Sequence, residues 1–157
     1  MNMEFFNKLG VFYEKVLKLF EKQKEVIQKF EQEFQNMYTG NNIDTYVDIG
    51  RPRITIAIPV NPIKVNVFKE RSYLIKEFEF QIIEDDEIII DVIYDEYEID
   101  EKSNEERLES TNVGEEIIRI EKGAFGKIKF LIFNTQLVEK IIDYLIEIMN
   151  KILLKQR

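Results

Sequence analysis

The chain has 157 residues, of which 45% are hydrophobic and 33% charged, and its formal net charge is −8. A chain of this length suits one domain, and so many apolar residues exclude an intrinsically disordered protein. Uninterrupted apolar runs such as Ile88-Ile89-Ile90 fall far short of the roughly 20 residues that cross a bilayer, so we expect no membrane segment. Charges interrupt the apolar N-terminus, which predicts no signal peptide and a cytoplasmic protein.

The chain contains neither Cys nor His. This excludes disulfides, thiolate zinc sites, Ser-His-Asp triads and imidazole acid–base chemistry. Any metal would be held by oxygen ligands, which favours Mg²⁺, Mn²⁺ or Ca²⁺ over zinc or copper. A composition rich in Ile, Glu and Lys resembles that of hyperthermophile proteins and their viruses, and an AT-rich genome gives the same bias, so both origins stay open.

The N-terminal part predicts one long helix over residues 3–37. Its apolar residues recur every three or four positions, with one longer step, and Thr39-Gly40 is the stop signal. Unbroken, this helix would be about 50 Å long, which exceeds a small domain, so we expect a helix-mediated homodimer. The predicted stripe consists of Phe5, Leu9, Phe12, Val16, Phe20, Ile27, Phe30, Phe34 and Met37.

Strand signals follow, and they predict a mostly antiparallel sheet of five to six strands. Alternation is clearest in residues 53–60, 73–83 and 87–99, and weaker in 45–49 and 64–68. Two further segments, 116–121 and 127–133, form a hairpin around the turn 123–126. The polar range 101–114 predicts a flexible loop.

A second amphipathic helix is predicted to begin at Asn134 or Thr135 and to pack on the sheet. The predicted fold class is therefore α+β: a long N-terminal helix, the sheet and a C-terminal helix, all in one domain over 1–157. The main stripe of the second helix is Leu137, Ile141, Leu145, Ile148 and Ile152.

Charge is segregated along the chain. The segment 84–109 holds thirteen acids against two bases, whereas the remainder carries +3. We expect Asp95, Glu96 and Glu98 to face water on a surface that docks a basic protein partner. Crowded carboxylates also predict raised pKa values in this segment through mutual repulsion.

An alternative interpretation of the same segment is a divalent-metal-dependent phosphodiesterase or nuclease. The triplet Asp100-Glu101-Lys102, downstream of Asp86 and Asp91, looks like the PD-(D/E)xK nuclease arrangement, although the usual Pro is absent. The resemblance implies that Asp86 and Asp91 bind Mg²⁺ or Mn²⁺ and that Asp100 and Lys102 complete the site. It covers only these few residues. The metal would neutralise phosphate charge and activate water.

A local basic patch is the only feature that favours nucleic-acid binding. Arg51 and Arg53 would form it with Lys64, Lys69, Arg71 and Lys76 if these residues line one sheet edge. The sequence therefore predicts a non-enzymatic interaction protein without a cofactor, a homodimer that presents an acidic surface to a basic protein. The metal-dependent nuclease is the alternative.

Overall fold

The computed structural model describes residues 3–30, 37–40, 43–48, 53–83 and 87–155. Among these residues, two helices flank seven strands, which confirms the predicted α+β arrangement, although the sheet has seven strands and not the five to six expected. None of the helices among these residues is long and apolar enough to span a membrane. The elements are α1 (Met3–Phe30), β1 (Met37–Gly40), β2 (Ile43–Asp48), β3 (Arg53–Phe68), β4 (Arg71–Ile83), β5 (Glu87–Ile99), β6 (Glu106–Lys122), a 3-10 turn (Ala124–Gly126), β7 (Ile128–Ile132) and α2 (Thr135–Lys155).

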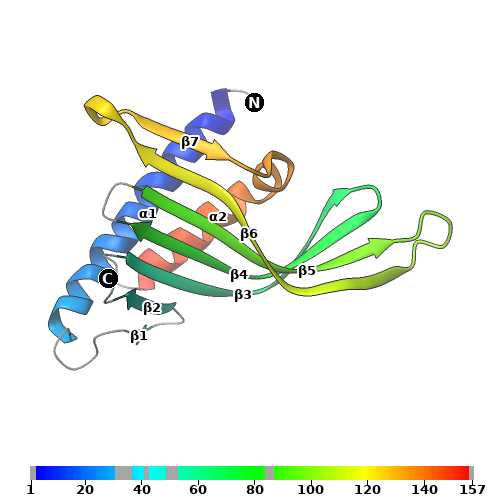
Figure 1. Cartoon of the computed structure of the whole chain (residues 1–157), viewed down its shortest axis with the longest axis horizontal. Coiled ribbons are helices and arrows are strands. Elements are labelled where there is room, and N and C mark those ends of the chain that lie inside the picture. The colour runs from blue at the N-terminus through cyan, green and yellow to red at the C-terminus, as the bar shows by residue number, and fades with distance from the viewer. Residues whose placement is uncertain (1–2, 31–36, 41–42, 49–52, 84–86, 156–157) are drawn as a thin grey trace.

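The seven strands form one antiparallel sheet in which the order in space follows the order in the sequence, from β1 to β7. Both helices lie on the same face of this sheet, and they contact each other (Figure 1). The paired strands β3–β4 and β5–β6 are much longer than the others and continue beyond the helices as two extended hairpins (Figure 1). The sheet therefore has a helix-covered half and a half that no described helix covers.

Alternation along the strands builds the core. Phe78, Phe80 and Ile82 are buried under the helices, as the period of two predicts. Phe80 pairs with Ile56 on β3 and Ile90 on β5, and its ring lies 6.0 Å from that of Phe12 on α1. Phe5, Leu9, Phe12, Val16 and Phe20 of the first predicted stripe and the main stripe of α2 join this cluster, because a 3.6-residue period brings them onto the sheet.

Two boundaries differ from the prediction. Met37 belongs to β1, where it pairs with Tyr46, and not to the helix stripe. Residues 53–68 form one strand, because a register shift between Pro59 and Ile63 accommodates the prolines that we expected to end it. Three predicted stripe residues, Ile27, Phe30 and Phe34, have side chains outside the described part.

The predicted loop 101–114 is wrong for most of its length. Strand β6 begins at Glu106, and Glu106, Arg107 and Leu108 pair with the end of β5. These polar residues lack the apolar alternation that marks a half-buried strand, because neither of their faces lies under a helix. Backbone pairing with β5 holds them extended instead.

Candidate functional site: the acidic hairpin

The acidic segment forms the outer end of the β5–β6 hairpin, and Asp100 builds its turn. The Asp100 carboxylate accepts hydrogen bonds from the backbone N–H of Lys102 and the hydroxyl of Ser103, both at 3.1 Å. The Asp100 carbonyl accepts a further bond from Asn104, which adopts the left-handed conformation that Asn tolerates. The Asp100-Glu101-Lys102 triplet is therefore a structural turn.

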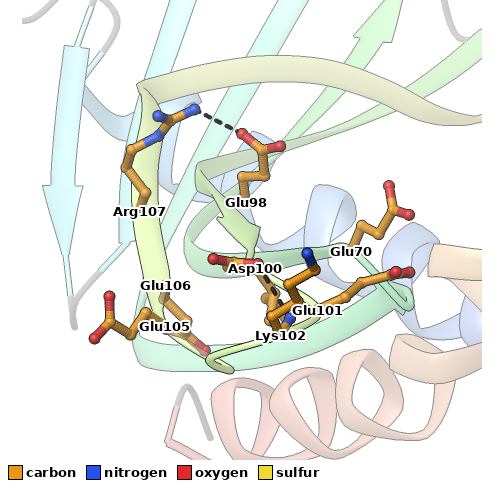
Figure 2. Close-up of a pocket in the computed structure, with 9 residues that line it drawn as sticks. Glu70, Glu98, Asp100, Glu101, Lys102, Glu105, Glu106 and Arg107 are labelled. Atoms are coloured by element: carbon orange, nitrogen blue, oxygen red, sulfur yellow. Dashed lines mark hydrogen bonds and ion pairs between the residues drawn. The ribbon is translucent and has the colours of Figure 1, made fainter.

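A hollow of about 720 Å³ lies at this turn, between the ends of the two long hairpins. Glu70 and Glu101 lie on one side of it and Glu105 on the other (Figure 2). Among the described residues, these three side chains have no ion pair. The charged side chains that line the hollow are Glu70, Glu98, Asp100, Glu101, Glu105 and Glu106, against Lys102 and Arg107.

Asp95, which we expected to face water, is buried with 7% of its surface exposed. One of its carboxylate oxygens lies 2.9 Å from Lys76 Nζ, and the other accepts a hydrogen bond from the backbone N–H of Asn112 at 3.0 Å. The contact with Asn112 lies where the β5–β6 register shifts, between the pairs of Tyr94 and Glu96. Asp95 thus holds an irregularity of the hairpin together, and the prediction that it faces water is wrong.

Glu96 and Glu98 are also engaged within the chain. Glu96 lies 3.0 Å from Arg71 on β4, and Glu98 lies 2.8 Å from Arg107 on β6 (Figure 2 shows the second pair). Arg107 also contacts Glu109, at 2.7 Å. The carboxylates expected to be free for a partner are therefore largely neutralised by cations on neighbouring strands.

Cations of the predicted basic patch are the partners of the acidic residues in these ion pairs. Lys64 contacts Glu106, while Arg71 and Lys76 contact Glu96 and Asp95. Three described cations of the predicted patch, Lys64, Arg71 and Lys76, are thus neutralised by acids on neighbouring strands. Sequence alternation could place each residue on a strand face, but the pairing depends on a strand register that the sequence does not specify. Of the patch residues expected to bind, Arg51 and the side chain of Arg53 lie outside the described part.

The pKa values follow this pairing. Hydrogen bonding to Lys76 lowers the pKa of Asp95, and hydrogen bonding to Arg107 lowers that of Glu109. We expected like-charge repulsion to raise pKa values in this segment, and at these two residues that expectation is wrong. At both carboxylates, the cation on a neighbouring or the same strand outweighs the desolvation that would raise the pKa.

Among the described residues of the predicted nuclease site, Asp91 is not brought together with Asp100 and Lys102. Asp91 lies in the middle of β5 and Asp100 just beyond its end, about 30 Å apart along the strand at 3.3 Å per residue. Asp91 sits on the sheet face opposite the helices, where it pairs with Glu79 and Glu116. No group of three carboxylates among the described residues is placed to hold a metal ion, and Asp86 is outside that part of the chain.

A polar network that the sequence analysis missed joins the hairpin to α2. Tyr94 is buried, stacks on Tyr73 with ring centroids 4.1 Å apart, and donates its hydroxyl to Glu115 at 3.2 Å. Asn134 also donates its side-chain N–H to Glu115, while its side-chain oxygen Oδ1 caps α2 by accepting from the N–H of Leu137. Burial raises the pKa of Tyr94, so its hydroxyl stays protonated and acts as a donor. This network anchors the hairpin at the edge of the core.

Comparison of the chain with protein-family models, with curated proteins and with solved structures gives no match.

Proposed function

We propose that this protein is a non-enzymatic interaction module that binds a Lys- or Arg-rich segment of a protein partner at the end of its β5–β6 hairpin. The observation that supports the proposal is the hollow at the turn, where six acids face two bases. Glu101 and Glu105 are exposed and have no ion pair within the described residues, so their charge is available to a partner.

The proposed binding residues, Glu101 and Glu105, lie nearer the end of the hairpin than the residues predicted from the sequence. Asp95, Glu96 and Glu98 each contact a cation of their own chain, and a partner would have to break those contacts. Glu101 and Glu105 have no ion pair among the described residues, so a partner can bind them without breaking a contact within the chain. A rigid hairpin that carries unpaired charge at its end also reduces the entropy lost when a partner binds.

The test compares two double variants that change the net charge by the same amount. Glu101→Gln with Glu105→Gln alters the hairpin turn, whereas Glu14→Gln with Glu21→Gln alters two exposed glutamates on α1. The probe is an oligolysine peptide, and affinity is measured by isothermal titration calorimetry at two salt concentrations. We expect the hairpin variant to weaken binding severalfold and the α1 variant to have little effect. Equal weakening by both variants, or no binding by the unmodified protein, would contradict the proposal.

The nuclease alternative makes a separate prediction that the same protein can test. It requires a Mg²⁺- or Mn²⁺-dependent cleavage of DNA or RNA that is abolished by Asp91→Asn. We expect no such activity, because the strand separates Asp91 from Asp100 and Lys102. Metal-dependent cleavage that disappears in Asp91→Asn but survives in Glu101→Gln would replace the binding proposal with the nuclease.

A further inference from the structure

We infer that the protein forms a symmetric homodimer in which the β7 strands of two copies pair antiparallel, and α1 of one copy packs against α1 of the other. The sequence predicted a homodimer through the helices alone, and the structure points to the sheet edge beside α1. This inference does not depend on the acidic hairpin.

The first observation is the open edge of the sheet. β7 pairs with β6 on one side, and no described strand pairs with its other side. Two hydrogen bonds fix which backbone groups face outward: Gly123 N–H donates to the carbonyl of Lys127, and Phe133 N–H donates to that of Ile117. In an antiparallel ladder, alternate residues face the same neighbour. Lys127, Lys129, Leu131 and Phe133 therefore bond to β6, and the N–H and C=O groups of Ile128, Phe130 and Ile132 point outward.

This edge is complementary to itself. If Phe130 lies on the twofold axis, Ile128 meets Ile132 of the other copy, and both are residues whose backbone groups point outward. Lys129 then lies beside Leu131 of the other copy, and Lys127 lies beside its Phe133. No two lysines are placed directly opposite, so the pairing avoids the like-charge contacts that destabilise neighbouring strands.

The second observation is a second apolar stripe on α1, in which Met3 and Phe6 are exposed while Tyr13 and Leu17 pack partly against the core. Met3, Phe6, Gly10, Tyr13 and Leu17 recur at alternating steps of three and four residues, the spacing of a coiled-coil seam. This stripe differs from the buried one that packs on the sheet. A ring contact with Phe130 places it on the β7 side of the helix, because the Tyr13 ring meets the Phe130 ring edge-on with centroids 6.2 Å apart.

The opposite flank of α1 is occupied by α2. There, Lys8 Nζ lies 3.0 Å from the Asp143 carboxylate of α2. The flank with Phe6, Gly10 and Tyr13 therefore borders the open edge. When two β7 strands pair about a twofold axis, the two α1 helices meet on the same side of the extended sheet. Gly10 faces open space, since a Cβ there would meet nothing within 4 Å, and its lack of a side chain allows the second helix to approach closely.

The apolar surface at this edge suits an interface. Met3 is 75%, Phe6 45%, Ile128 38% and Phe133 56% exposed. With about 200 Å² for a fully exposed large side chain, these four present roughly 400 Å² in each copy. Two copies bring roughly 800 Å² before the paired backbones are counted, and a stable interface needs roughly 1,000 Å² in total. β7 without α1 would fall short of this area, which is why the inference includes both elements.

The chain has no cysteine, so single cysteines can report the register. Facing residues of a non-hydrogen-bonded antiparallel pair have Cα atoms about 4.5 Å apart, within the range of a disulfide. Lys129 and Leu131 of the other copy form such a pair in the inferred dimer. Two copies of residue 129 lie diagonally, roughly 8 Å apart, which is too far for a disulfide without backbone movement.

The experiment mixes the variants Lys129→Cys and Leu131→Cys under mild oxidation and follows covalent dimers by gel electrophoresis, with each variant alone as the control. We expect the mixture to cross-link at least tenfold faster than either variant alone. Sedimentation of the unmodified protein should give twice the 18.8 kDa chain mass. Ile128→Pro removes one outward N–H without touching the β6 ladder, and it should weaken the dimer at least tenfold. A monomer at all accessible concentrations, or a dimer in which the mixture cross-links no faster than the single variants, would overturn the inference.

Discussion

The two halves of the long strands are held by different forces. Under the helices, β4 and β5 contribute Phe78, Phe80 and Ile90, which are fully buried. Beyond the helices the same two strands contribute Lys76, Asp95 and Glu96, which form ion pairs and hydrogen bonds with one another and with neighbouring strands. A strand can thus continue past its hydrophobic core when the register brings opposite charges together. We expect the first half to depend on apolar volume and the second on pH and salt.

The largest effect should come from the core. Phe80→Ala removes a ring that lies against Phe12 and between Ile56 and Ile90, and it should lower the free energy of unfolding by about 3–5 kcal/mol. Leu108→Ala is the control, because Leu108 lies in the outer part of β6 and is 49% exposed. It should change stability by less than about 0.5 kcal/mol in urea denaturation. Similar losses in both variants would break the distinction between the two halves.

An intermediate effect is expected at Asp95. Asp95→Asn weakens the contacts with Lys76 and Asn112, and each lost hydrogen bond should cost about 1 kcal/mol at pH 7. The pKa of Asp95 is lowered in the folded protein, so its contribution is present above the unfolded value of about 3.9 and is lost as pH falls through the folded value. The stability difference between Asp95→Asn and the unmodified protein should therefore shrink below about pH 4. A difference that is independent of pH would show that Asp95 acts without its charge.

The smallest effect concerns Phe125 in the β6–β7 turn. Phe125 is fully exposed and has a φ of 61°, a conformation that costs a non-glycine residue roughly 1 kcal/mol. Because Asn tolerates this conformation better, Phe125→Asn should raise the free energy of unfolding by about 0.5 kcal/mol. Thermal denaturation would measure it, with Ala124→Asn as the matched control. A loss of stability in Phe125→Asn would contradict this prediction and would indicate that the Phe125 ring makes stabilising contacts.

The sequence predicted the helix-covered half well and the outer half poorly. Local periodicity was sufficient for the core, since alternation placed Phe78 and Phe80 inward, and the cap at Asn134 follows from its residue type. In the outer half the decisive contacts join residues far apart in the chain, such as Lys76 with Asp95 and Lys64 with Glu106. Strand register determines those contacts. The register shifts at Lys76 in the pairing of β4 with β3 and again in its pairing with β5, which alters the alternation that the sequence suggests.

The candidate site was predicted in its region but not in its residues. The acidic segment was evident from charge alone, whereas three of the neutralising cations, Lys64, Arg71 and Lys76, lie on β3 and β4, and their pairing became visible only with the fold. The role of Glu70 could not be predicted from the sequence for the same reason. Glu70 lies outside the acidic segment in the sequence, yet it lines the hollow with Glu101 because the β3–β4 turn ends beside the β5–β6 turn.

Hydrogen exchange at two salt concentrations tests the difference between the two halves most directly. Raising NaCl from about 0.05 M to about 1 M shortens the Debye length from more than 10 Å to about 3 Å and so weakens exposed ion pairs. At constant pH, we predict that amide protection in residues 93–110 falls severalfold, while protection in 78–92 and 115–122 stays unchanged. Equal changes in both halves, or greater loss in the helix-covered half, would contradict the account.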